Sequence, residues 1–326
     1  MFYVVMLAIN PIKFNFNSNY QNTRQNRTAQ IHLPPVSFSG SVKTLEHYTG
    51  GISRKVAADI HAEAKPIYKT FIENLFNLFG DAIANEKFPK RPIFEITHRL
   101  KEPESIAAKA ISNDFSSKAQ VKEKCGDIIG ARIVLNDTRK TQVDKILERL
   151  TNAIRLKVLD CTEIESFRSI PEHAYVTDDR MRIIERVSAR PGKTFSSTNT
   201  PYKSGYTAFH MNLNLPKGYV GEIQVMGKHM NEFKEVEDLL YKIKHNKNLD
   251  HKYKYIQDKL QPIMKKLTPK QKNALEHYTT DQYMAVREAE IANKPFEYLP
   301  VPKNLPPELD FKTLHEMQQT CDAKAV

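Results

Sequence analysis

Cysteine is scarce in this chain: its 326 residues include only Cys125, Cys161 and Cys321. None of the three stands in a Cys-x-x-Cys pair, which argues against a zinc site and against a disulfide framework. The sequence also lacks an apolar run long enough to cross a membrane. The apolar opening at residues 1–9 has no basic residues before it, so it fits a signal peptide poorly. We therefore expect a reduced, cytoplasmic protein with no membrane partner.

Acidic residues are in the minority, since 49 lysines and arginines face 38 aspartates and glutamates, and the formal net charge is +11 at pH 7. A basic balance favours an anionic partner, either nucleotide phosphates or RNA, without deciding between them. The length allows one large domain or two modest ones.

Composition and periodicity divide the chain into five segments. Residues 1–43 are rich in Asn, Gln, Ser and Thr and show no periodicity, so we predict a flexible leader. Apolar residues three and four apart predict a helical region over 44–92. Short β-type runs mix with helices over 93–246, helices return over 247–292, and a Pro-rich tail at 293–326 is expected to wrap the surface or to be mobile. The expected fold is α+β, a mixed β-sheet flanked by helices with helical N- and C-terminal extensions.

The expected strands are short apolar or alternating runs, at 94–100, 127–135, 154–159, 206–215 and 219–225. The expected helices follow the 3.6-residue period, at 103–115, at 140–153 and, with breaks near 246–249 and at Pro269, over 230–291. A stretch rich in Gly, Ser, Thr and Pro at 191–204 is typical of a loop. Pro216-Lys-Gly218 suits a hairpin turn between the last two strands.

Two carboxylates are placed on short β-type runs. Asp127 leads Asp127-Ile-Ile-Gly-Ala-Arg-Ile-Val-Leu135, and Glu222 lies in Gly221-Glu-Ile-Gln-Val225. Acids held by rigid strands could jointly hold a divalent cation, and magnesium prefers one or two carboxylates with substrate phosphates in the rest of its shell. Each acid could equally cap a strand or pair with a nearby base, and the spacing alone does not choose.

The alternation of the last two strands predicts a polar sheet face. Side chains on a strand point to opposite faces with period two, so one face of 206–215 carries Tyr206, Ala208, His210, Asn212 and Asn214, opposite an apolar face. The same rule places Glu222 and Gln224 together. If the hairpin forms, the two polar faces can line one cleft; the alternative is a solvated sheet face, common in antiparallel sheets.

A group of cations lies upstream. Arg99 and Lys101 are two apart in extended chain, and Ser105 and Lys109 are four apart on the following helix, so each pair shares a face. This spacing directs three cations and a hydroxyl toward the start of a helix, which favours phosphate binding. A nucleoside triphosphate is the economical ligand, although such residues are also ordinary on a solvated surface.

Taken in order, four motifs over about 94–244 resemble the synthetase domain of the RelA/SpoT family. They are Arg-x-Lys-x-x-x-Ser-x-x-x-Lys from Arg99, Asp127-Ile-Ile-Gly-Ala-Arg132, Gly205-Tyr-Thr-Ala-Phe-His210 and Glu222-Ile-Gln224. The resemblance implies a mixed sheet related to nucleotidyltransferases. It also implies a Mg²⁺-dependent pyrophosphokinase that transfers pyrophosphate from ATP to the 3′-hydroxyl of GDP or GTP and makes (p)ppGpp. The family's hydrolase and regulatory modules have no counterpart in the sequence, so a synthetase-only member is expected.

The resemblance also assigns roles to residues. Four positions match the grip on the ATP phosphates: Arg99, Lys101, Ser105 and Lys109. Asp127 and Glu222 match the magnesium carboxylates, and Glu222 is also placed to take the proton from the attacking hydroxyl. Tyr206 matches the residue that stacks on the acceptor base. His210 and Gln224 match supporting positions near the acceptor phosphates and the metal site. Lys203, one position away from the family's lysine, is also assigned to the acceptor nucleotide.

Two departures from the family pattern keep alternatives open. The chain reads Pro201-Tyr-Lys-Ser-Gly-Tyr206 where the family has Pro-Lys-x-Asn-Gly-Tyr, and Val225-Met-Gly227 where the family has Ile-Arg-Thr, so one cation near the metal is missing. A toxin-type relative that uses adenine nucleotides or the tRNA 3′ end as acceptor is one alternative. A catalytically inactive domain that binds nucleotide or RNA is the other. Partners beyond the nucleotides could be RNA or tRNA, a second copy of the chain, or an antitoxin.

Overall fold

The structure is a computed structural model that describes residues 52–189, 194–201, 203–245, 247 and 249–324. The chain divides into two units, residues 1–35 and residues 36–326, and every described residue belongs to the second. The predicted leader at 1–43 lies outside the described residues, so its flexibility stays a prediction.

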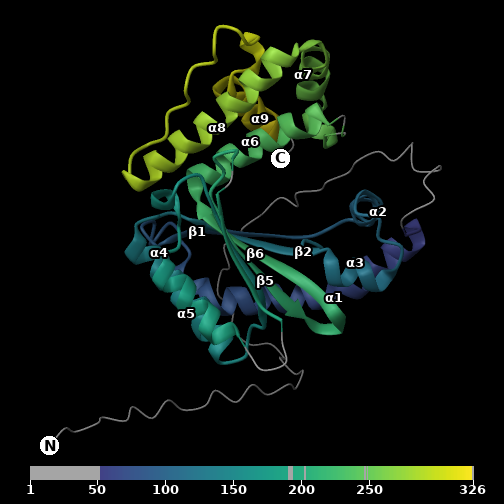
Figure 1. Cartoon of the computed structure of the whole chain (residues 1–326), viewed down its shortest axis with the longest axis vertical. Coiled ribbons are helices and arrows are strands. Elements are labelled where there is room, and N and C mark those ends of the chain that lie inside the picture. Colours follow the sequence, from purple (N-terminus) through teal and green to yellow (C-terminus); the bar gives the residue numbers. More distant parts are fainter. Residues whose placement is uncertain (1–51, 190–193, 202, 246, 248, 325–326) are drawn as a thin grey trace, which may run out of the picture. The chain divides into compact units, whose positions relative to one another are not determined.

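Six strands form one mixed sheet in the order β1-β2-β6-β5-β3-β4 (Figure 1). Their bounds are β1 (Ile93–Leu100), β2 (Ile129–Leu135), β3 (Cys161–Arg168), β4 (Ser196–Pro201), β5 (Ala208–Leu215) and β6 (Tyr219–Gly227). β2 pairs with β6 in parallel, as β3 does with β4, and the other neighbours are antiparallel. The predicted α+β class with a mixed sheet is confirmed.

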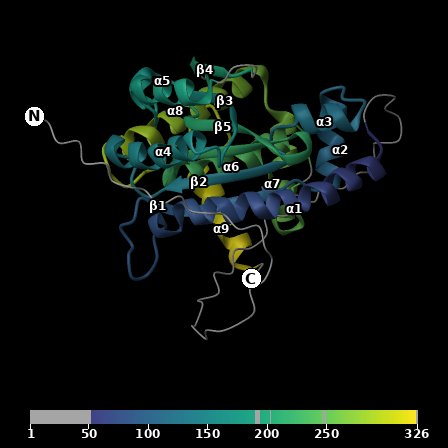
Figure 2. The same cartoon turned by 90° about the horizontal axis from the view of Figure 1, so that it is seen from below.

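Helices flank this sheet. Their bounds are α1 (Arg54–Phe79), α2 (Pro103–Ser112), α3 (Lys118–Lys124), α4 (Lys140–Arg155), α5 (Asp178–Ser188), α6 (Lys228–Lys244), α7 (Lys254–Lys266), α8 (Pro269–Ile291) and α9 (Phe311–Lys324). Helix α1 packs along β1 and β2, as Figure 2 shows, while α6 to α9 pack on one another at the top of Figure 1. No helix in the described part of the chain is both long and apolar enough to cross a membrane.

Alternation and helical period account for the core. On β5 the apolar face predicted from the sequence is buried, with Phe209, Met211 and Leu213 at 0% exposure, and only Leu215 at its end is partly exposed. Ile60 and Leu75, on the apolar stripe of α1, are equally buried. The turn at Pro216–Gly218 joins β5 to β6 as an antiparallel hairpin, as predicted. The predicted helix breaks are also present, and Pro269 begins α8.

Some local predictions differ from the structure. The strand predicted at 154–159 is wrong, because buried Ile154 extends the apolar stripe of α4 and the turn that follows contains Lys157 at φ 61°. The loop predicted at 191–204 contains β4, an edge strand of Ser, Thr and Asn without an apolar alternation to reveal it. The sequence did not indicate α3, α5 or α9. The end of the predicted tail is helical, because α9 buries Phe311 and Leu314 against the core.

Candidate active site

Asp127 lies in a turn two residues before β2, and not on the strand as the sequence suggested. Each of its oxygens accepts a hydrogen bond from one ammonium group: Lys109 Nζ lies 2.6 Å from Oδ1, and Lys101 Nζ lies 2.6 Å from Oδ2. The backbone N–H of Lys101 also donates to the carbonyl of Ile128 at 2.8 Å, which holds the end of β1 beside Asp127. Three of the predicted phosphate-site and metal-site residues therefore meet in one cluster.

The charges of this cluster fix its protonation states. Burial raises the pKa of Asp127, but the two ammonium groups outweigh burial and hold that pKa well below its usual range. Burial lowers the pKa of Lys101, and the charge of Asp127 opposes that shift only in part. Asp127 is therefore an ionised carboxylate shared by two lysines, and its single negative charge leaves the cluster with a net positive charge.

The sheet register brings Arg99 and Glu222 into one row. Gly130 on β2 is the register partner of Arg99 on β1 and of Glu222 on β6. Because neighbouring strands lie about 4.8 Å apart, the Cα atoms of Arg99 and Glu222 are about 10 Å apart. A Cβ at Gly130 would lie 3.7 Å from Cγ and Nε of Arg99, so the arginine side chain crosses the space that glycine leaves. The same guanidinium lies 3.6 Å from Asp127.

Glu222 is held by two neighbours. His210 Nδ1 lies 2.9 Å from Glu222 Oε1, and Gln224 Nε2 donates to Oε2 at 2.8 Å. Burial raises the pKa of Glu222, but the hydrogen bond and charge of His210, with a contribution from Arg99, bring that pKa below its usual value. Both predicted carboxylates are thus ionised, and both lie within electrostatic reach of one arginine. The hairpin places Glu222, Gln224 and His210 on one face, as predicted.

Ser105 occupies the predicted place in the first turn of α2, where it is half-buried. Pro103 is the first residue of this helix, and the N-cap residue Glu102 makes no side-chain capping bond. The first N–H groups of a helix have no partner within it, and together with the helix dipole they favour an anion. Lys109 lies one turn further along α2. The geometry fits an anion-binding start of α2, while the roles of Ser105 and Lys109 toward ATP stay predictions.

Tyr206 is enclosed, which the sequence did not indicate. Its side chain is 9% exposed, and its hydroxyl lies 3.1 Å from His210 Nε2. The ring of Tyr283, from α8, packs against it edge-on with centroids 5.8 Å apart and planes at 77°. Phe167 and His210 also lie beside this ring, each with centroids 6.1 Å away. A base can stack only on an open ring face, so the predicted stacking role requires a rearrangement around Tyr206. Lys203 is exposed and does not join the cluster; the hydrogen bond at this residue is made by its carbonyl with Thr280.

The sequence reasoning missed two cations on α6. Burial lowers the pKa of Lys242 to about 8; the charge of Asp238 opposes this shift, and the charges of Arg99 and Lys234 add to it. Lys234 Nζ lies 6.0 Å from the centre of the Tyr206 ring and donates to Glu237 at 3.1 Å. Residues 234, 238 and 242 are four apart, so they share one face of α6. That spacing was the signal available in the sequence.

The side chains at this site include possible magnesium ligands. Among the described residues no group of three or more His, Cys, Asp or Glu side chains could hold a metal ion. Magnesium bound together with substrate phosphates needs only one or two carboxylates. Asp127 and Glu222 are ionised, and a carboxylate oxygen that accepts one hydrogen bond retains a second acceptor position. The chemistry of each acid therefore suits a magnesium ligand, while their joint hold on one ion stays a prediction.

An ionised carboxylate on a sheet face and a second one in the adjoining turn, beside lysine and arginine side chains, are typical of domains that bind nucleotides and act on their phosphates. The family model described as "Region found in RelA / SpoT proteins" matches residues 98–247. The chain therefore contains a RelA/SpoT synthetase domain, and the resemblance of its motifs is confirmed. Helices α7, α8 and α9 lie outside the matched region.

Solved structures give distant likenesses. The chain is similar to small alarmone synthetase 1 from Bacillus subtilis bound to its product pppGpp, at 19% identity, with 63% of this chain and 86% of that chain covered and a TM-score of 0.36. The same synthetase bound to AMPCPP gives 18% identity, coverages of 66% and 91%, and a TM-score of 0.32. A GTP pyrophosphokinase family protein from Streptococcus pneumoniae has 18% identity to the chain, with 73% of this chain and 96% of that chain covered and a TM-score of 0.34. No curated protein matches the chain.

Proposed function

We propose that this protein is a magnesium-dependent pyrophosphokinase that transfers pyrophosphate from ATP to the 3′-hydroxyl of GDP or GTP, making (p)ppGpp. The observation that carries the proposal is the meeting of Lys101, Lys109 and Arg99 on Asp127, within reach of Glu222, inside a RelA/SpoT synthetase domain. Transfer of a phosphoryl-type group depends on positioning and charge stabilisation more than on covalent chemistry.

The cluster around Asp127 provides the ATP side. Without a ligand, the one negative charge of Asp127 offsets the two positive charges of Lys101 and Lys109 only in part; a triphosphate offers these cations more negative charge. The uncapped start of α2, with Ser105 in its first turn, adds donors for the same phosphates. Asp127 and Glu222 would hold magnesium, which when bound supplies charge neutralisation on the transferred group.

Glu222 acts on the acceptor nucleotide. It is ionised, so it can accept the proton of the attacking 3′-hydroxyl, and a positioned carboxylate is a suitable general base for that step. His210 and Gln224 hold one oxygen each, which fixes the direction of the carboxylate. Proton acceptance at Glu222 and phosphate binding at Lys101 and Lys109 are the two tasks of this chain's own residues.

The experiment is an acceptor screen with γ-³²P-labelled ATP and magnesium, followed by chromatography. We expect label on GDP or GTP with the wild type and its loss in Asp127→Asn and Glu222→Gln. Glu148→Gln, the same exchange at an exposed position on α4, is the control and should leave transfer unchanged. A wild type that labels no acceptor but still binds ATP would replace the proposal by the inactive nucleotide-binding domain.

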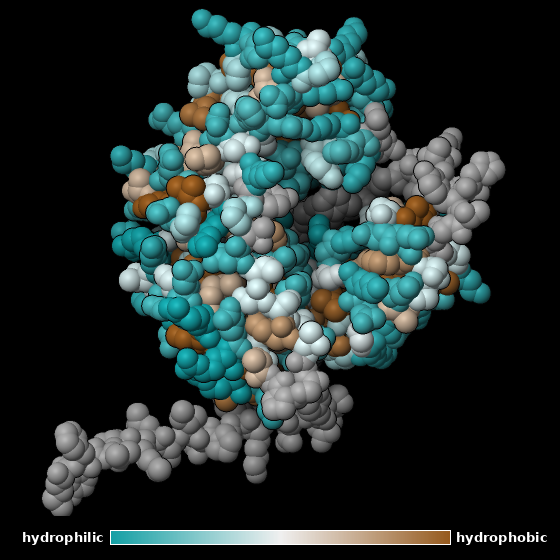
Figure 3. Space-filling view, viewed as in Figure 1, coloured by the Kyte–Doolittle hydropathy of each residue, from teal (hydrophilic) through white to brown (hydrophobic). Residues whose placement is uncertain are grey.

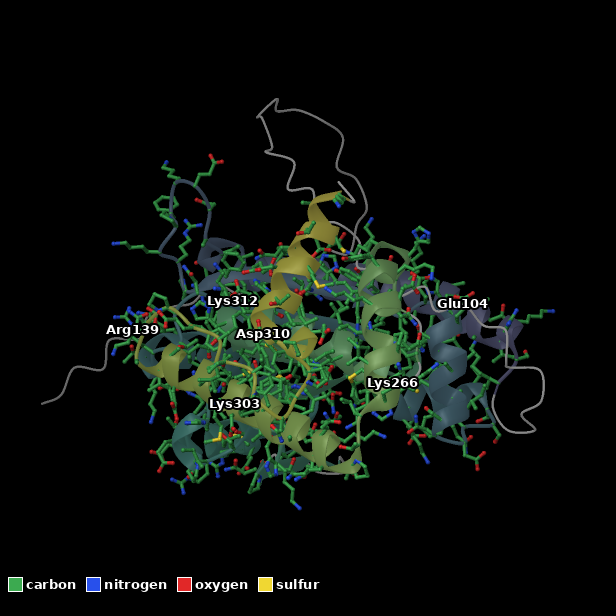
Figure 4. All side chains as sticks on the ribbon, turned by 90° about the horizontal axis from the view of Figure 1, so that it is seen from above. Glu104, Arg139, Lys266, Lys303, Asp310 and Lys312 are labelled. Atoms are coloured by element: carbon green, nitrogen blue, oxygen red, sulfur yellow. The ribbon has the colours of Figure 1, made fainter. Side chains whose placement is uncertain are left out.

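A specific observation favours the tRNA 3′ end as a second candidate acceptor. Residues 241–275 contain ten lysines and two aspartates and no other acid. On the exposed side of α7, Lys259, Lys265 and Lys266 have no acidic partner among the described residues (Figure 4 labels Lys266), and Tyr255 is 65% exposed. Figure 3 shows mostly hydrophilic side chains over these helices. Lysines attract a phosphate backbone and an exposed aromatic ring can stack on a base.

Charge reversal separates the two acceptors. Changing Lys259, Lys265 and Lys266 together to Glu should abolish labelling of deacylated tRNA and leave labelling of GDP intact. The matched control reverses three exposed lysines of α1: Lys55, Lys65 and Lys69. Labelling of tRNA that survives the first triple variant, or falls equally in both, would contradict a role for α7 in acceptor binding.

A further inference from the structure

Helix α8, which lies outside the matched family region, is anchored where the sequence departs from the family pattern. A Cβ at Gly227 would lie 2.0 Å from Oε1 of Glu290, so no other residue fits without displacing that carboxylate. The same oxygen accepts a hydrogen bond from the backbone N–H of Met230 at 3.0 Å, in the first turn of α6. Gly227 stands where the family has Thr, and the docking of α8 is the physical reason that a glycine is needed there.

The anchor is buried and has several contacts. Glu290 is 5% exposed and pairs with Arg287 at 3.2 Å. Arg287 is 2% exposed, donates from Nε to the carbonyl of His173 at 2.6 Å, and lies over the ring of Tyr175 at 3.9 Å. The hydroxyl of Tyr175 in turn donates to Glu290 and accepts the N–H of Gly227. The C-terminal half of α8 is thus fixed to the synthetase domain by an ion pair whose groups are nearly all satisfied.

Helix α8 also passes directly over the Gly205-Tyr206 motif. Gly205 has φ +80°, and a Cβ there would lie 2.6 Å from the carbonyl oxygen of Thr280 and 2.9 Å from Cβ of Tyr283. The close approach and the left-handed backbone both require glycine at this position. One turn of α8 therefore rests on the residue that precedes Tyr206.

Tyr283 is one of three ring neighbours of Tyr206, at 5.8 Å between ring centroids, while Phe167 and His210 each lie 6.1 Å away. Tyr283 is 2% exposed, packs against Phe233 with ring centroids 4.6 Å apart, and donates from its hydroxyl to Glu237 at 3.2 Å. These contacts hold its ring against Tyr206, whose own side chain is 9% exposed. Because Tyr283 is packed on several sides, it cannot swing away from Tyr206 as an exposed side chain would.

We propose that Tyr283 is the residue that determines access to the acceptor site: it occupies the side of Tyr206 on which an acceptor base would stack. This inference rests on the proposed function, which identifies GDP or GTP as the acceptor. It concerns only the affinity for that nucleotide, and a binding measurement tests it. With Tyr283 in place, a guanosine nucleotide binds weakly. With its ring removed, the Tyr206 face opens and the nucleotide gains a stacking contact.

The test measures GDP binding to the full chain by isothermal titration calorimetry. Tyr283→Ala should bind GDP roughly 5- to 150-fold more tightly than the wild type, the range that one base–aromatic stack supplies. Adding Tyr206→Ala to Tyr283→Ala should remove the gain. Tyr283→Phe keeps the ring and should bind GDP as the wild type does. Tyr278→Ala, at a buried tyrosine on the same helix that packs on Phe311, is the matched control for loss of core volume.

The outcomes separate this inference from the proposed function. Unchanged or weaker GDP binding by Tyr283→Ala, in protein that unfolds at the same temperature as Tyr278→Ala, would overturn the inference. So would a gain that survives the loss of Tyr206. If Tyr283→Ala does not fold, Tyr283→Leu retains apolar volume without the ring and is read in the same way. Tighter GDP binding without any transfer of label would refute the pyrophosphokinase and leave the inference standing.

Discussion

The change Asp127→Asn tests the central cluster most directly, because it removes one charge and keeps the shape of the side chain. In the folded protein the Asp127 side chain is 22% exposed, that of Lys101 14% and that of Lys109 33%. Breaking a buried ion pair by removing one partner costs about 3–5 kcal/mol, whereas exposed pairs contribute roughly 0–1 kcal/mol. A partly buried carboxylate shared by two lysines lies between these limits, so we expect a loss of about 2–3 kcal/mol at pH 7.

The loss should depend on pH with a definite sign. The pKa of Asp127 is lower in the folded protein than the value of about 3.9 in an unfolded chain. A group with a depressed folded pKa contributes stability above its unfolded pKa and loses that contribution as the pH falls toward the folded pKa. The difference between wild type and Asp127→Asn should therefore be constant from pH 7 to about pH 5 and shrink below about pH 4.

Urea unfolding followed by circular dichroism at pH 7 and pH 3.5 measures this difference. The matched control is Asp81→Asn, since Asp81 is 68% exposed and makes two hydrogen bonds to Arg149 on the surface. Its loss should stay below about 1 kcal/mol. An Asp127→Asn variant no less stable than Asp81→Asn, or one whose deficit is the same at both pH values, would refute the ion-pair account of the site.

Three further predictions concern catalysis, charge and packing. Glu222→Gln should lower the rate of pyrophosphate transfer by about 100-fold or more, with a much smaller loss of ATP affinity from its place beside magnesium, and equal losses in both would mean that Glu222 is not the base. Because the pKa of Lys242 is about 8, its charge is lost as the pH rises through that value, so the affinity for ATP should fall between about pH 7 and pH 9 in the wild type. The affinity should stay level in Lys242→Arg, and the same decline there would exclude Lys242 as the cause. Gly227→Ala should destabilise the fold by about 1–3 kcal/mol through its clash with Glu290, measured by urea unfolding. Gly80→Ala, where a Cβ meets nothing within 4 Å, should change little, and equal losses would remove the packing argument.

Local pattern was sufficient for the centre of the sheet. The alternation on either side of Pro216–Gly218 predicted β5, β6 and their hairpin, because a period of two and a turn signal depend only on neighbours in sequence. The same reasoning placed His210, Glu222 and Gln224 on one face. It failed for β4, an edge strand of small polar residues paired only with β3. It failed again at 154–159, where burial of Ile154 extends α4.

The amino-acid sequence by itself therefore determined the fold class, the order of the RelA/SpoT motifs and the kinds of side chain available for phosphate and metal. Tertiary structure alone decided how those side chains meet. Arg99 reaches toward Asp127 and Glu222 because three strands align at Gly130, and neither the register of distant strands nor the space above a glycine is encoded in a local period. The closing of Tyr206 by Tyr283 is likewise a contact between segments far apart in the chain, set by how α8 packs on the domain.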